Sequence, residues 1–175
     1  VVWIPVRNDD GTYSKKLTLI SEHKNVSEGY MPLTKTNISK VAFSALGNTY
    51  GWGGSLNSDD CSGYMRNVYK CFGMELARNT TWQSSMPMAK VDMKNMAKEE
   101  RMKILEKLPC GTILYISGHE MMYLGERNGR YYVISATGII MQPENPSVRQ
   151  RISSVVVNTL DTKRANGNTW LEELT

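Results

Sequence analysis

The spacing of hydrophobic residues predicts helices in the first half of the chain and strands in the second. Apolar residues recur every three or four positions over residues 34–46 and 61–72, as they do along the buried side of a helix. Gly47 and Gly73 directly follow these two segments, and a glycine commonly ends a helix. Residues 98–108 form a third, more highly charged segment of this kind, which stops before a proline.

The second half changes to short runs rich in β-branched and aromatic residues. Asn128-Gly129 between two of these runs is a strong signal for a tight hairpin turn. Helices followed by an antiparallel sheet describe an α+β fold, with a polar end and an amphipathic tail around Trp170. The predicted strands are residues 112–117, 119–126, 130–136 and 152–160.

The N-terminal residues predict a separate hairpin. Residues 1–7 and 15–20 flank Asn8-Asp-Asp-Gly11, a turn sequence, but two strands alone are only marginally stable. We therefore expect this hairpin to pack either against the main domain or against strands that precede residue 1. The predicted organisation is a hairpin and connector over residues 1–33, followed by a main domain over residues 34–175.

Composition narrows the class of protein. The chain has 175 residues, 41% of them hydrophobic and 22% charged, which suits one globular domain with a small appendage. The formal net charge of +4 is mild, and the lysines and arginines are scattered, so nucleic-acid binding is disfavoured. No apolar run reaches the ~20 residues that span a bilayer. We expect a monomer without a membrane span.

Only one of the three cysteines lies in a context that favours chemistry. Cys61 follows a glycine-rich loop and an acidic residue and begins a predicted helix, where the aligned backbone dipoles favour a thiolate. Cys71 and Cys110 are predicted to be small buried hydrophobic residues. An odd number of cysteines with no Cys-x-x-Cys pair indicates neither a disulfide framework nor a zinc site.

Three motifs together resemble the NlpC/P60 family of bacterial cell-wall cysteine peptidases. The first is Tyr50-Gly-Trp-Gly-Gly followed by Asp60-Cys-Ser-Gly. The second, Pro109-Cys-Gly-Thr-Ile-Leu-Tyr115, is similar to the family's Pro-Gly-Asp-Leu strand. The third, His119-Glu-Met-Met-Tyr-Leu-Gly125, is similar to its His-Val-Gly-Ile-Tyr-Leu-Gly strand. The resemblance covers roughly residues 34–140 and implies a papain-like fold. Because some relatives carry bacterial SH3-like domains upstream, we expect residues 1 to about 30 to be the end of such a domain or the link to it.

The resemblance implies the catalytic residues. Cys61 corresponds to the nucleophile and His119 to the base, while His23 reads as a solvated surface residue of the connector. At the third position, which usually holds a histidine or another polar residue, this chain has Ser135. A serine hydroxyl can accept a hydrogen bond from imidazole, but it is shorter than histidine, so we expect a water or another group to complete the contact. A serine that merely packs in the strand is an equal alternative.

The resemblance also implies a site for the amino end of the substrate. In relatives that act on a free N-terminal L-Ala-γ-D-Glu, the tyrosine, the aspartate and the serine of the first motif hold the amine. Asp60 alternatively caps the helix, and both roles can coexist. Thr80 or Thr81 is placed to cap a short helix, and Thr80 stands where relatives have a substrate-binding serine. The predicted substrate-binding residues are Tyr50, Trp52, Asp60, Ser62, Arg78 and Thr80.

These observations predict a cysteine peptidase that hydrolyses γ-D-glutamyl bonds to a diamino acid in peptidoglycan stem peptides. The resemblance implies no metal and no organic cofactor. A secreted or cell-envelope protein is expected, its signal peptide having been removed. Two alternatives remain open: another papain-like acyl-transfer enzyme, such as an amidase or acyltransferase, and a non-catalytic wall-binding module.

Overall fold

We analysed a computed structural model that describes residues 1–21 and 26–175. The chain divides into two units, residues 1–30 and 31–175, and each is described by itself. His23, which we predicted to be a solvated surface residue, lies outside the described residues. In the described part of the chain, no helix has the length and apolar character needed to cross a bilayer.

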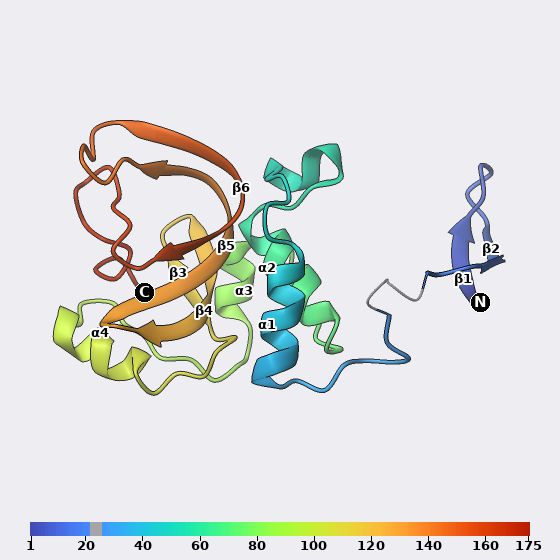
Figure 1. Ribbon diagram of the computed structural model, residues 1–175, viewed down its shortest axis with the longest axis horizontal. Helices are drawn as coiled ribbons and strands as arrows, with labels where there is room; N and C mark the ends of the chain where they lie inside the picture. Colours follow the sequence, from blue (N-terminus) through green and yellow to red (C-terminus); the bar gives the residue numbers. More distant parts are fainter. Residues whose placement is uncertain (22–25) are drawn as a thin grey trace. The chain divides into compact units, whose positions relative to one another are not determined.

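The first unit contains the predicted hairpin. Strands β1 (Val2–Arg7) and β2 (Tyr13–Thr18) pair antiparallel, with Val2 opposite Thr18 (Figure 1). The turn between them closes because Asp10 Oδ1 accepts hydrogen bonds from Thr12 N (2.9 Å) and Thr12 Oγ1 (2.6 Å). The hairpin prediction is confirmed. Its membership of an SH3-like domain stays a prediction.

Two of the longer helices of the second unit begin at polar caps. Helix α1 (Lys35–Ser44) starts after Thr34, whose side chain accepts a hydrogen bond from Asn37 N, as predicted. Helix α2 (Cys61–Lys70) is capped by Asp60. Helix α4 (Lys98–Leu105) completes the set and is shorter than expected.

The cap of the short helix α3 (Thr80–Ser85) differs from the prediction. Asn79, and neither Thr80 nor Thr81, accepts the hydrogen bond from Trp82 N at 2.9 Å. An asparagine side chain caps a helix as well as a threonine side chain does. Asn79, the first of the three adjacent polar residues, is the N-cap here. Thr80 then becomes the first residue inside the helix, and its hydroxyl is available for other contacts.

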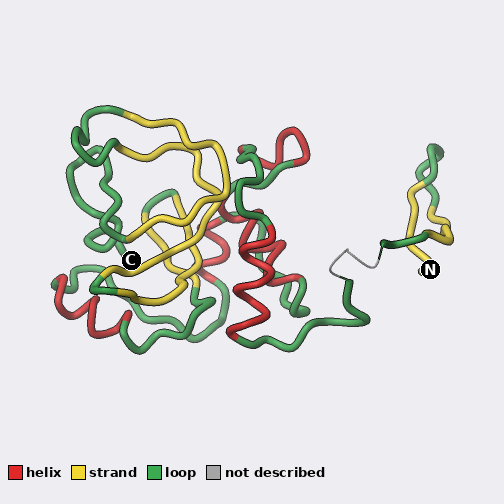
Figure 2. The backbone as a smooth tube through the Cα atoms, in the orientation of Figure 1, coloured by secondary structure: helices red, strands yellow, loops and turns green. Residues whose placement is uncertain are grey.

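Four strands form one antiparallel sheet in the order β3-β4-β5-β6 (Figure 2). Strand β5 continues five residues beyond its predicted end, and strand β6 begins three residues before its predicted start. The pairing of β5 with β6 shifts its register between Thr137 and Ile139. The alternation of apolar residues therefore changes phase at Gly138, which is why the sequence pattern did not show these strands at full length. The α+β prediction is confirmed. The bounds are β3 Ile113–Ile116, β4 His119–Arg127, β5 Arg130–Met141 and β6 Arg149–Thr159.

The sheet separates two hydrophobic cores. Helices α1 and α2 pack against one face, which presents Met122, Ile134 and Ala136. Helix α4 and the C-terminal segment cover the other face, as the ribbon in Figure 1 shows. That segment is built of turns, and it buries Trp170 and Leu174 in the second core. Because strand side chains alternate between faces, consecutive residues of β4 belong to different cores.

Candidate active site

The loop before Cys61 depends on its glycines. Gly53 and Gly54 have φ angles of 68° and 84°, in the left-handed region that residues with a Cβ rarely adopt. A Cβ on Gly51 would lie 1.9 Å from Ser58 Oγ and 2.3 Å from Ser55 O, so no other residue fits there without rearrangement. The glycine-rich sequence is therefore needed to fold the chain tightly against the start of α2.

Asp60 holds this loop and the helix together. Its Oδ1 accepts hydrogen bonds from Gly63 N (2.8 Å), Arg78 Nη1 (3.0 Å) and Ser62 Oγ (3.2 Å). Its Oδ2 accepts from Arg78 Nη2 (2.9 Å) and Gly53 N (3.0 Å). Burial acts to raise the pKa of Asp60, but Arg78 and the two backbone N–H groups outweigh it and hold the pKa below its usual value. The predicted capping role of Asp60 is present.

The other residues predicted to bind the substrate occupy different environments. Ser62 is buried, and its single hydroxyl proton is shared between Asp60 Oδ1 at 3.2 Å and Arg78 O at 3.0 Å, so it belongs to the Asp60 contacts. Tyr50 is held by a hydrogen bond from its N to Ser153 O on β6, and its ring covers Gly138, where a Cβ would lie 3.4 Å from the ring. Trp52 is 81% exposed. Only Tyr50 of these three lines the cleft described below.

Cys61 begins helix α2, as predicted, but its environment does not favour a thiolate in the free protein. The side chain is buried, and Sγ lies 3.8 Å from Thr80 Oγ1. Burial raises the pKa of the Cys61 thiol above its usual value, and the Thr80 hydroxyl and the Glu120 N–H offset this only in part. The expected lowering of the thiol pKa is therefore not found in this state, because burial, with smaller contributions from the charges of Glu120 and Asp60, outweighs these two hydrogen bonds.

His119 contacts Ser135 directly, so the expected bridging water is not needed. The distance from His119 Nε2 to Ser135 Oγ is 3.1 Å, and Ser135 Oγ lies 2.9 Å from Thr137 Oγ1. The Thr137 hydroxyl donates its proton to the Ser135 carbonyl oxygen. Thr137 Oγ1 is therefore the acceptor, and the Ser135 hydroxyl the donor, in the contact between the two side chains. Ser135 then accepts from His119, which assigns the imidazole proton to Nε2 and leaves Nδ1 as the basic nitrogen.

Cys61 and His119 line the same cleft, which has a volume of about 480 Å³. The His119 ring packs against Trp170 with centroids 5.3 Å apart. Burial, with a smaller contribution from the positive charge of Arg164, lowers the pKa of His119 to about 4. The imidazole is thus neutral at pH 7. Among the described residues, no hydrogen bond joins His119 to Cys61.

Glu120 is an unexpected buried acid beside the cysteine. Its side chain is fully buried, and neither carboxyl oxygen has a hydrogen-bond partner among the described residues. Burial raises its pKa to about 7; the nearby Thr80 hydroxyl opposes the rise, and the charge of Asp60 adds to it. The family motif has valine at the position of Glu120. The sequence therefore showed that this residue is unusual, but it did not indicate what the carboxyl group does.

The remaining cysteines are only partly as predicted. Cys71 at the end of α2 is exposed, so its assignment as a buried residue is wrong; it follows the last turn and faces away from the core. Cys110 is partly buried, packs against the first core and contacts Ser39 Oγ at 3.3 Å. In the described part of the chain, no group of three or more histidine, cysteine or acidic residues is arranged to hold a metal ion.

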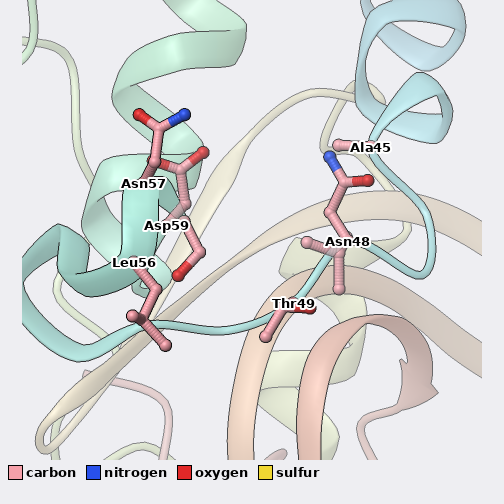
Figure 3. A pocket seen from close by; sticks show the side chains of 8 residues that line it. Ala45, Asn48, Thr49, Leu56, Asn57 and Asp59 are labelled. Atoms are coloured by element: carbon pink, nitrogen blue, oxygen red, sulfur yellow. The ribbon is translucent and has the colours of Figure 1, made fainter.

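A second hollow lies on the other side of the active-site loop. Figure 3 shows Leu56, Asn57 and Asp59 on one wall and Ala45, Asn48 and Thr49 on the other. Its volume is about 230 Å³. Asp59 is already hydrogen-bonded to Asn67 Nδ2 at 2.9 Å. Neither Cys61 nor His119 lines this hollow, so we assign the chemistry to the larger cleft.

Several residues of the larger cleft were not found from the sequence. Thr137 lies two positions beyond Ser135 on the same strand face, a spacing that could have identified it. Trp170 and the basic residues of the C-terminal segment come from far along the chain, and no local pattern connects them with Cys61. The residues that sequence reasoning missed are Thr137, Arg149, Lys163, Arg164 and Trp170.

Comparisons with known proteins agree with this arrangement. The sequence pattern of the NlpC/P60 family matches residues 47–168. The chain therefore belongs to the NlpC/P60 family of peptidoglycan hydrolases, whose members are typically cysteine peptidases. The comparison with curated proteins gives no match.

Solved structures share the fold. An NlpC/P60 endopeptidase from Photobacterium damselae subsp. piscicida superposes with a TM-score of 0.71 at 21% identity, over 91% of this chain and 39% of that chain. An NlpC/P60 family protein from Bacillus cereus superposes with a TM-score of 0.50 at 21% identity, over 97% of this chain and 44% of that one. The chain thus spans less than half the length of these two proteins.

The stability of the protein should depend on the protonation of Glu120. Its pKa rises from 4.5 in the unfolded chain to about 7 in the folded protein, so its contribution to stability is full below pH 4.5 and is lost as the pH rises through 7. Glu120→Gln should remove this fall, which is of the order of 3 kcal/mol. Urea unfolding between pH 4 and pH 8.5 measures it, with exposed Glu144→Gln as the control. Equal pH slopes for wild type and Glu120→Gln would contradict the assignment.

The contact between His119 and Ser135 should fix the imidazole tautomer. Ser135→Ala removes the acceptor for Nε2–H, and Thr137→Val removes the group that turns the Ser135 hydroxyl away from His119. Each change should lower kcat/KM by about tenfold, the effect of one hydrogen bond of ~1.4 kcal/mol. The ¹⁵N shifts of the His119 ring should show Nε2–H in the wild type and a mixture of tautomers in both variants. A wild-type ring protonated on Nδ1 would refute this.

Proposed function

We propose that the chain is a cysteine peptidase that hydrolyses the γ-D-glutamyl bond to a diamino acid in peptidoglycan stem peptides with a free N-terminal L-Ala, outside the cytoplasm. The observation that carries the proposal is that Cys61, at the start of α2, and His119, bonded to Ser135, line one cleft. A nucleophile, a base and a group that orients the base are the parts that acyl transfer needs. Membership of the NlpC/P60 family supports the substrate class.

The reaction begins from a neutral pair. With the pKa of Cys61 raised and that of His119 near 4, thiol and imidazole are both uncharged in the free protein at pH 7. Substrate brings the groups into register, and His119 Nδ1 takes the thiol proton as the sulfur attacks the γ-carbonyl carbon. His119 then gives this proton to the leaving amine, which departs as the carbon–nitrogen bond breaks. Water attacks the thioester and releases the acid and the free thiol.

The oxyanion of the tetrahedral intermediate lies close to the helix start. The first N–H groups of a helix have no partner within the helix, and Cys61 N is the first of α2. This group, with the positive end of the helix dipole, stabilises negative charge on the carbonyl oxygen. The capping carboxylate of Asp60 holds the N-terminus of α2 in place while this happens.

Recognition of the free amine requires an exchange of partners at Asp60. The carboxylate already accepts three hydrogen bonds at Oδ1 and two at Oδ2, and Arg78 supplies one to each oxygen. The Arg78 side chain is 40% exposed and can swing away. We infer that the substrate amine replaces Arg78 beside Tyr50, while Thr80 contacts the chain next to Cys61 and Trp52 covers it from the exposed loop.

Three features of the site around Cys61 are compatible with a different function. Cys61 contacts Thr80, its thiol pKa is raised, and no hydrogen bond to His119 is present among the described residues. A wall-binding module without catalysis would tolerate these features. Measured turnover of stem peptides distinguishes the peptidase from the wall-binding module. Hydrolysis of other amide or ester substrates would instead identify an acyl-transfer enzyme of another kind.

Cleavage of stem peptides should depend on Cys61 and His119. Cys61→Ala should abolish cleavage, and His119→Ala should lower kcat by at least about 10²-fold because the thiol loses its proton acceptor. Mass spectrometry of L-Ala-γ-D-Glu-diamino acid digests measures the products, and circular dichroism checks folding. Exposed Cys71→Ala is the matched control and should retain full activity. No cleavage by the wild type, or cleavage by Cys61→Ala, would refute the proposed reaction.

Removing Arg78 should reveal whether Asp60 binds the amine. Arg78→Met frees both carboxylate oxygens, so KM for the free-amine peptide should fall several-fold, while KM for its N-acetylated form should not fall. Arg66→Met, which removes an exposed arginine on α2, is the control. If Arg78→Met changes the two substrates equally, Asp60 has only its structural role, and an endopeptidase acting on intact wall becomes the better assignment.

A further inference from the structure

We propose that Arg149, Lys163 and Arg164 form an anion subsite that binds a carboxylate on the leaving-group half of the peptide substrate. The proposal rests on the proposed peptidase function and names a specificity that the family assignment does not provide. The three residues line the same cleft as Cys61 and His119, and its lining includes no aspartate or glutamate. A cleft with cations only on its walls concentrates negative charge on its ligand.

Among the described residues, none of these three cations forms a salt bridge, and the charge of Arg164 acts on Glu173 only at longer range. The salt bridges of the described residues involve Arg66, Lys70 and Arg78, all in the helical half of the chain. Cations left unpaired in a cleft keep their capacity to bind a ligand, and a guanidinium pairs with a carboxylate through two parallel hydrogen bonds. The cleft therefore offers this geometry to an anion that enters it.

Backbone contacts fix the two neighbouring cations at the cleft wall. Arg164 Nη1 donates to Ser117 O at 3.0 Å, which places the guanidinium beside the turn between β3 and β4. The turn that carries Lys163 and Arg164 is closed by Arg164 N to Asn168 O at 2.8 Å and Gly167 N to Arg164 O at 2.9 Å. Arg149 reaches the cleft from the start of β6. The site is thus assembled from three separate segments.

The position of Arg164 assigns the subsite to the leaving group. Ser117 and Gly118 directly precede His119, and the charge of Arg164 acts on the His119 ring. His119 delivers its proton to the leaving amine, so the residues beyond the scissile bond lie along His119. A diamino acid leaving group that ends the peptide carries a free carboxylate on the carbon next to its amide nitrogen, which we expect to face this wall. Arg164 and Lys163 then select substrates that have this charge.

The test compares two substrates that differ only in that charge. One is L-Ala-γ-D-Glu-L-Lys with a free terminal carboxylate, and the other is its terminal amide. The wild type should cleave the acid with a kcat/KM at least about tenfold above that for the amide, the usual value of a charge-assisted hydrogen bond. Arg149→Gln, Lys163→Gln and Arg164→Gln should each reduce this ratio, and the triple variant should bring it close to one. Arg130→Gln, at the exposed β4–β5 turn, should preserve it.

The ratio is the readout because removing Arg164 also changes the charge beside His119, which alters both substrates alike. Equal cleavage of acid and amide by the wild type overturns the subsite while leaving the peptidase intact. If neither peptide is cleaved, the proposed function fails, and calorimetry with Cys61→Ala protein still tests the subsite. Preferential binding of N-acetyl-L-lysine over its amide, lost in the triple variant, supports it. Equal binding of both, or preference for a polymer such as teichoic acid alone, refutes it.

Discussion

The Asp60 carboxylate is the contact on which the arrangement of the site depends. It connects the glycine loop, the first turn of α2 and the segment that precedes α3 through Gly53, Gly63 and Arg78. Each of these segments is too short or too polar to fix its own position by burying apolar surface. A buried carboxylate is stable only when hydrogen-bond donors balance its negative charge. The contacts that stabilise the Asp60 carboxylate therefore also position Cys61.

Burial then determines the charge states around the cysteine. Removing charged groups from water favours the neutral forms of Cys61, His119 and Glu120 together, which is why the free protein does not hold a thiolate–imidazolium pair. In the proposed reaction the proton moves when the substrate is bound, and a scissile carbonyl at the helix start would place the new charge where it is stabilised. Such a site keeps its thiol protected from oxidation and metal binding until a substrate arrives.

The sequence predicted the parts of the structure that local patterns encode. The helix starts, the hairpin at Asn128-Gly129 and the order of helices before strands follow from caps, turn chemistry and periodicity. Cys61, His119 and Ser135 could be named because the motifs that carry them resemble a family. Three other features could not be predicted: the pKa of Cys61, the exposure of Cys71 and the cations around His119. They depend on which distant segments of the chain cover each residue.

The alternation of strand β4 explains why the site lies where the two cores meet. His119 shares its face with Met121 and the Trp170 side of the sheet, whereas Glu120 shares its face with Met122 and helix α2. The nucleophile therefore approaches from one face and the base from the other, and they can meet only at the end of the strand, where β4 begins. A shift of one residue in the β4 register would exchange the two side chains and point the carboxyl group into the cleft. The pairing of Ile116 with His119 across the tight turn at Gly118 prevents this shift, so that turn secures the catalytic arrangement as much as the cysteine helix does.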